Sequence, residues 1–150
     1  MYNILKFIHV TSIAVWFGGL VMLLLLNRLF VGAGDQGTAQ AIGRQGGKFG
    51  TRLFLPAVAV TLITGIGMVQ LHDLGFGTTW VVWGITGLVA SMILGGVLTG
   101  ATARKLAERV AAGTVDAATI AATQRRILMF AVINVLLLLS VIWAMVAKPS

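Results

Sequence analysis

The first apolar stretch of the chain, YNILKFIHVTSIAVWFGGLVMLLLLNRLFV (residues 2–31), determines the fold. A helix needs about 20 apolar residues to cross roughly 30 Å of hydrocarbon, and this stretch exceeds that length. Between Ile4 and Leu26 its one charged residue is Lys6, close to the N-terminal end. The stretch is also longer than the apolar part of a signal peptide, which has about 7–15 residues. We therefore expect an uncleaved first transmembrane helix over residues 4–30.

The composition extends this prediction to a protein that crosses the membrane several times. Of its 150 residues, 58% are hydrophobic and 10% are charged, and the mean hydropathy is +0.98. These values are typical of integral membrane proteins and exclude a soluble globular domain. The net charge is +7, but the basic residues border apolar spans, so their expected partners are anionic lipid headgroups and not nucleic acid. The absence of cysteine excludes disulfides, thiolate metal sites and thiol redox chemistry.

Three further apolar stretches predict an all-α membrane bundle of four antiparallel, up-and-down helices in a single domain. The Gly-rich polar segment 32–50 is expected to be a loop with a short helical turn. The third and fourth helical patterns continue past the membrane as a polar hairpin, in which Gly113 ends one helix and Asp116 caps the next. The expected spans are residues 4–30, 53–72, 79–103 and 125–147.

The distribution of basic residues predicts the orientation of the bundle. Nine of the eleven basic residues lie in or beside the first and third loops, whereas Lys6 and Lys148 lie on the other side. Lysine and arginine near the ends of spans are enriched on the cytoplasmic side. We therefore expect a multi-pass protein of the inner (plasma) membrane, with both termini outside and loops 1 and 3 in the cytoplasm.

Both histidines are expected in the outer half of the bilayer, His9 in the first helix and His72 at the end of the second. An ionisable residue inside a membrane span is a functional-site hypothesis by default. Neutral imidazoles from two helices can ligate iron or copper. The first hypothesis is therefore a bis-histidine haem that carries electrons, with Gly19, Gly65 and Gly67 making room for the porphyrin.

Two other hypotheses use the same region. A copper site would combine the histidines with Met145 and with Met68, which lies four residues before His72 on the same helical face. Alternatively, the protein is a non-catalytic membrane subunit, because a histidine near a membrane interface can sit there without a ligand. Trp16 either lines the cofactor or belongs to an interfacial aromatic belt, and Lys6 either pairs with a haem propionate or extends to the interface.

The first helix also carries a family resemblance. Its pattern Y-x3-K-x2-H-x6-W-x2-G-L resembles the first helix of HemJ-type protoporphyrinogen oxidases and is similar to the CopD-type copper-resistance membrane domain; it is formed by Tyr2, Lys6, His9, Trp16, Gly19 and Leu20. Residues 28–31 resemble the RLFV string of that family, about one turn later than expected. The resemblance covers about the first thirty residues and the four-span layout. It implies that His9 is a haem-linked histidine, that the cofactor is haem b and that the protein is an oxidoreductase.

The chain departs from the HemJ-type oxidases in two respects. It has no histidine after residues 28–31, and its third span has no lysine, the nearest being Lys105 beyond the expected cytoplasmic end. These differences count against protoporphyrinogen oxidation and leave haem binding, with His72 as the candidate second ligand. The small-residue faces of the helices also permit a homodimer. No feature of the sequence identifies an electron donor or acceptor.

Overall fold

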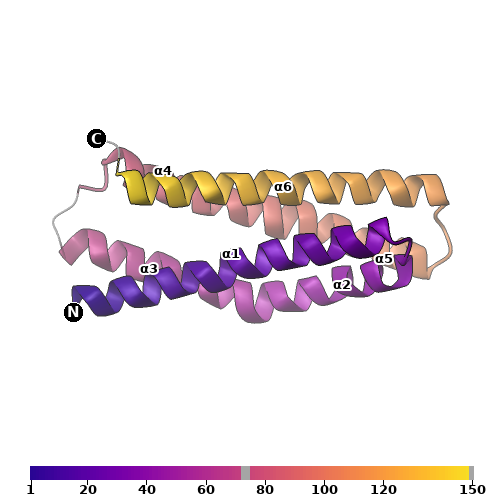
Figure 1. Ribbon diagram of the computed structural model, residues 1–150, viewed down its shortest axis with the longest axis horizontal. Helices are drawn as coiled ribbons and strands as arrows, with labels where there is room; N and C mark the ends of the chain where they lie inside the picture. Colours follow the sequence, from indigo (N-terminus) through magenta and orange to yellow (C-terminus); the bar gives the residue numbers. More distant parts are fainter. Residues whose placement is uncertain (72–74, 149–150) are drawn as a thin grey trace.

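The computed structural model of the chain is an all-α bundle of four long apolar helices packed antiparallel (Figure 1). The structure describes residues 1–71 and 75–148, excluding the side chains of residues 36, 39, 40, 43, 44 and 49. Within these residues, four helices are long and apolar enough to cross a membrane: Tyr2–Gly32, Gln45–Leu71, Thr79–Ala111 and Ala117–Ala147.

The first two spans and the segment between them form a helical hairpin. The first span is α1 (Tyr2–Gly32). A tight turn leads to α2 (Gln36–Phe49), which continues through the π-helical segment η1 (Gly50–Phe54) into α3 (Leu55–Leu71). The second apolar span is therefore the distal part of a longer helical rod.

The prediction of a Gly-rich loop over residues 32–50 is wrong, because most of this segment is α2. The side chain of Asp35 accepts a hydrogen bond of 2.9 Å from the Thr38 backbone N–H and so caps the first turn. A glycine costs about 1 kcal/mol relative to alanine in a helix interior, but α2 packs along α1 and α5. At one such contact, a Cβ on Gly46 would lie 4.0 Å from Leu23 Cδ1. Tertiary packing thus outweighs the low helix propensity.

The second half of the chain forms the other hairpin. It comprises α4 (Thr79–Met92), the π-helical segment η2 (Ile93–Gly100), α5 (Ala101–Ala111) and α6 (Ala117–Ala147). Gly113 follows α5 with φ of +65°, and the Asp116 side chain accepts the Thr119 backbone N–H at 3.2 Å. The predicted helix end and the predicted cap are both confirmed. The helical hairpin of α5 and the start of α6 extends beyond the apolar runs, as expected.

The four helices are arranged as two pairs, α1 with α3 and α4 with α6 (Figure 1). The start of α1, the end of α3, the start of α4 and the end of α6 lie at one end of the bundle, which we call the terminal end. The α1–α2 turn and the α5–α6 connection lie at the opposite end, which we call the loop end. Contacts between α1 and α6 join the two pairs.

The centre of the bundle is a small cluster around Trp16, which is 5% exposed. Its buried partners come one from each of the other three spans: Val58, Leu88 and Leu138. Many large apolar side chains elsewhere point outward, where in a bilayer they would contact lipid tails rather than water. Trp16 is therefore a core residue that touches all three neighbouring helices.

Candidate functional site

His9 lies about two helical turns from Trp16 towards the terminal end, on the side of α1 that faces α3. Its Nδ1 atom is 2.9 Å from the backbone carbonyl oxygen of Thr61 and 3.0 Å from the hydroxyl oxygen of Thr64. A carbonyl oxygen can only accept, so Nδ1 carries the proton and donates it. In the neutral ring this tautomer leaves a lone pair on Nε2, which is available to a ligand.

The two threonines of α3 use their hydroxyl groups differently. The Thr61 hydroxyl donates to the carbonyl of Ala57 at 2.8 Å, and the Thr64 hydroxyl donates to the carbonyl of Val60 at 2.6 Å. Such bonds to the preceding turn satisfy a hydroxyl proton inside an apolar helix. Because its proton is already used, the Thr64 oxygen acts towards His9 as an acceptor. Thr61 accepts the hydrogen bond of His9 through its backbone carbonyl.

Gly65 supplies the space that the imidazole occupies. A Cβ at this position would lie 3.1 Å from Cε1 and 3.6 Å from Nδ1 of His9. The first distance is shorter than an ordinary carbon–carbon contact, which is about 3.5–4.0 Å. A larger residue would displace the ring, so α3 determines both the position and the tautomer of His9.

The other glycines expected to make room for a porphyrin receive side chains of this chain. A Cβ on Gly19 would lie 2.5 Å from Phe54 Cε1, and a Cβ on Gly67 would lie 3.6 Å from Leu5 Cδ1. Small residues of this kind allow two helices to approach closely. At Gly19 and Gly67, side chains of this chain therefore fill the space between α1 and the helical segment formed by α2, η1 and α3.

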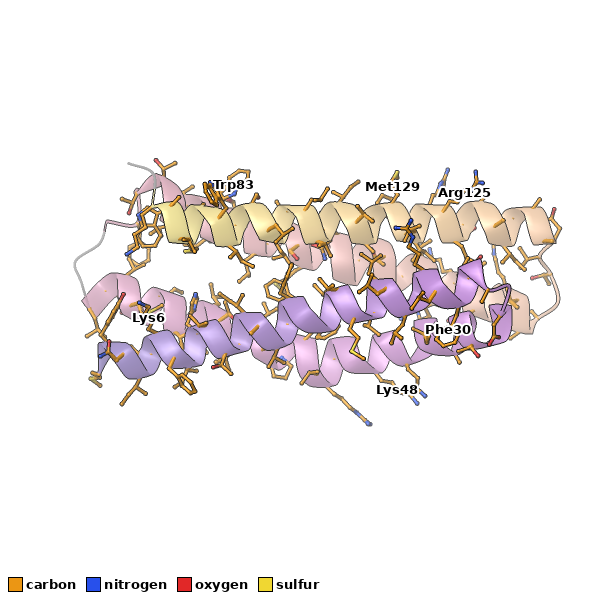
Figure 2. All side chains as sticks on the ribbon, viewed as in Figure 1. Lys6, Phe30, Lys48, Trp83, Arg125 and Met129 are labelled. Carbon is orange, nitrogen blue, oxygen red and sulfur yellow. The ribbon has the colours of Figure 1, made fainter. Side chains whose placement is uncertain are left out.

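The other sequence-predicted site residues in the described part of the chain lie in α1 and α3, with Lys6 about one helical turn before His9. Trp16 belongs to the hydrophobic core, Met68 is half-buried in α3, and Lys6 is exposed near the terminal end (Figure 2). The predicted second ligand, His72, lies outside the described residues. A cavity of about 380 Å³ near the same end is lined by residues of α4, of α6 and of the connection before α4, among them Trp80, and His9 is not one of them.

One residue of the copper hypothesis, Met145, lies against a different helix from His9. Met145 packs against α4, where a Cβ on Gly84 would overlap its terminal methyl group. His9 instead faces α3. Across residues 1–71 and 75–148, no group of three or more His, Cys, Asp or Glu side chains could hold a metal ion. The described part of the chain therefore offers one oriented imidazole rather than a ready ligand set.

Sequence reasoning missed Thr61 and Thr64, which hold the imidazole. A signal was present, because two threonines three residues apart and a following glycine interrupt an otherwise apolar span. Polar side chains in membrane helices often form hydrogen bonds to a neighbouring helix. They were therefore the natural partners to seek for an intramembrane histidine.

A second polar group lies between η2, the end of α4 and α6. Ser91 is 1% exposed and Asn134 is 3% exposed, and Ser91 Oγ and Asn134 Oδ1 have no hydrogen-bond partner among the described residues. A Cβ on Gly95 would lie 3.0 Å from Asn134 Nδ2. Buried polar atoms are normally paired, so this group costs stability that an apolar pair would not.

These features define a polytopic integral membrane protein, a four-span bundle that carries an oriented histidine within its first span. The family described as "predicted integral membrane protein (DUF2269)" matches residues 3–149. The chain belongs to this family, and the lipid bilayer is its environment. The match establishes no link to the HemJ-type or CopD-type proteins, so that resemblance stays a prediction. No curated protein and no solved structure matches the chain.

Proposed function

We propose that the protein is a membrane redox protein in which His9 ligates the iron of a haem b through Nε2. The hydrogen bond from His9 Nδ1 to the Thr61 carbonyl is the observation that supports this role. Metal-ligating histidines usually donate their second ring nitrogen to a carbonyl or carboxylate, which fixes the tautomer and increases the basicity of the ligand. The gap at Gly65 adds a fixed ring position to the fixed tautomer.

Haem b, when bound, supplies one-electron chemistry. The contribution of the chain is to hold the imidazole with its proton on Nδ1 and to surround it with apolar helix, which limits access of water. His72 is the candidate second axial ligand, and Lys6, at the same end, is the candidate partner of a propionate. Packing at Gly19 and Gly67 fills the contact between α1 and the helical segment formed by α2, η1 and α3, so the porphyrin is not expected at those two positions.

We further infer that the loop end faces the cytoplasm of the inner (plasma) membrane. Figure 2 shows Arg125 and Lys48 towards the loop end and Lys6 near the terminal end. Cytoplasmic ends of membrane spans carry the excess of lysine and arginine. His9 then lies in the outer half of the bilayer, and its electron donor and acceptor are unidentified.

A non-catalytic subunit is the second candidate, because one observation favours it. The bonds from His9 to Thr61 and Thr64 also join α1 to α3, which is a structural role in itself. The copper alternative has less support, since Met145 is engaged with Gly84 on the other helix pair.

Visible spectroscopy of the purified, haem-supplemented protein tests the proposal. We expect a Soret band that is lost in His9→Ala and kept in Thr61→Val, because the second variant retains the backbone carbonyl that orients the ring. A protein without a Soret band, or a band that survives in His9→Ala, would refute haem ligation by His9. Copper bound to a colourless protein would instead support the copper alternative, and no cofactor at all would support the structural subunit.

A further inference from the structure

A cavity of about 230 Å³ lies between α5 and α6 near the loop end, far from His9. Two helical faces line it, because the residues recur at intervals of three or four along each helix. Its polar lining consists of Thr102, Lys105 and Arg109 from α5 and Thr119, Thr123 and Arg126 from α6. The wall thus combines three cationic side chains with three hydroxyl groups.

The three cations of this cavity, Lys105, Arg109 and Arg126, have no carboxylate partner among the described residues. Glu108, the acidic residue of α5, pairs with Arg104 at 3.8 Å, and neither of these two lines the cavity. A negatively charged ligand in the cavity would therefore meet three cations that no carboxylate neutralises.

One acidic group lies beside the cavity, and it is already engaged. Asp116 caps α6, and hydrogen bonds from the Thr119 hydroxyl and from the Thr119 backbone N–H hold the pKa of its carboxyl below the usual range. Asp116 is therefore charged at neutral pH, but it is directed to the first turn of α6. The three cations still leave the region with a net positive charge.

Two of the three cavity hydroxyl groups already form hydrogen bonds within the protein. The Thr123 hydroxyl donates to the Thr119 carbonyl at 2.8 Å, and the Thr119 hydroxyl is used by Asp116. The Thr102 hydroxyl forms no hydrogen bond within the described part of the chain, so it can donate to a ligand. Two planar guanidinium groups, an ammonium group and a hydroxyl are a donor set that suits the oxygens of a phosphate.

The position of the cavity along the bundle indicates where such a ligand would come from. Arg126 directly precedes the uncharged run 127–147 of α6, and Thr102 is the second residue after the end of η2. The boundary between apolar and charged residues is the level at which phospholipid phosphates lie. The same opening can also be reached by a soluble phosphate compound from the aqueous side.

We propose that this cavity binds the phosphate group of an anionic ligand, held by Lys105, Arg109 and Arg126. Basic pockets between membrane helices recognise phosphate headgroups in the same manner. This site is independent of the haem proposal, because it lies at the opposite end of the bundle. The two sources of the phosphate, a lipid headgroup and a soluble compound, are separated by experiment.

The test uses the full chain and a matched pair of double variants. Arg109→Gln with Arg126→Gln removes two charges from the cavity, and Arg104→Gln with Arg125→Gln removes two charges from the same helices outside it. Native mass spectrometry in detergent measures retention of phosphatidylglycerol against phosphatidylcholine. In parallel, titration of inorganic phosphate into the protein in phosphatidylcholine nanodiscs measures binding of the soluble form.

We expect the cavity variant to weaken binding of phosphatidylglycerol or of inorganic phosphate at least about tenfold. The control variant should weaken the same binding less than about twofold. Selective loss of phosphatidylglycerol identifies a lipid, and selective loss of inorganic phosphate identifies a soluble ligand. Equal losses in both double variants, or no binding of either probe, would overturn the proposal. Arg126→Lys keeps the charge but loses the guanidinium fork, so a several-fold weakening is expected even if the double variant does not fold.

Discussion

Three residues of one face of α3 hold the His9 imidazole, each by a different means. Thr61 offers a carbonyl, Thr64 offers a hydroxyl oxygen and Gly65 offers the absence of a side chain. In an apolar environment these polar contacts have no water to compete with them, although hydrogen bonds between membrane helices average only about 0.6 kcal/mol. Single substitutions can therefore separate the three contributions.

Thr64→Val is expected to reduce the free energy of unfolding by roughly 0.5–1 kcal/mol, because it removes the oxygen that accepts from His9 Nδ1. Thr61→Val is the matched control, because both threonines are 5% exposed and the Thr61 hydroxyl bonds only within α3. Equilibrium unfolding in mixed detergent micelles measures the difference. Equal losses for the two variants would contradict the assignment of Thr64 as a partner of His9.

The sequence identified His9 as a candidate functional residue but did not predict the residues around it. His9 was recognisable because it is an ionisable group inside an apolar span. Its contacts depend on how α1 is rotated against α3, and the pattern of Thr61, Thr64 and Gly65 identifies its partners only once the two helices are known to be neighbours. Trp16 illustrates the same limit, since its burial against three other helices follows from the assembled bundle rather than from its own segment.

The contact between α4 and α6 is formed by glycines that receive side chains of the partner helix. A Cβ on Gly84 would overlap the terminal methyl of Met145, and a Cβ on Gly87 would overlap a methyl of Val141. The two partners differ in freedom, because methionine has three rotatable side-chain bonds whereas valine in a helix is largely restricted to one rotamer.

Gly87→Ala is therefore expected to destabilise the bundle by about 1–3 kcal/mol, and Gly84→Ala by clearly less. In the first variant Val141 cannot rotate out of the way, so the helices must separate; in the second, Met145 can change rotamer. Thermal unfolding of the two variants in the same detergent provides the measurement. A larger loss for Gly84→Ala would show that the α4–α6 contact is not packed as described.

Hydropathy and capping residues predicted most of the helices, whereas the glycine content of residues 32–50 gave a wrong prediction for α2. The four spans, the helix end at Gly113 and the cap at Asp116 followed from local rules. The segment that forms α2 was predicted as a loop because of its glycines, whereas its stability depends on contacts with α1 and α5. The π-helical segments η1 and η2 were likewise not predicted from the sequence.

For the molecule as a whole, the antiparallel order of the four spans was predicted and is confirmed. The pairing of α1 with α3 and of α4 with α6 was not predictable in the same way. A span that is apolar on every side faces lipid and protein equally well, so its sequence does not specify which neighbour it contacts. Small residues indicate which face of a span can approach another helix closely, but they do not specify which helix that is.

The inferred orientation gives a prediction that the cysteine-free chain makes straightforward to test. Gly77→Cys, in the α3–α4 connection, should react with a membrane-impermeant maleimide in intact cells. Ala112→Cys, at the end of α5, should react only after the membrane is permeabilised. The reverse labelling pattern would place the termini in the cytoplasm and His9 in the inner leaflet.

The π-helical segment η2 determines which way α5 faces. Each residue of an α-helix turns the chain by about 100°, so the extra residues that η2 accommodates rotate everything beyond it relative to α4. In the arrangement that results, Lys105 and Arg109 border the cavity opposite Arg126. Deleting one residue from η2 would rotate Lys105 and Arg109 by about 100° around the helix axis without changing the sequence of α5. The π-helical segment therefore sets the rotation of the charged helix α5 relative to the membrane span α4.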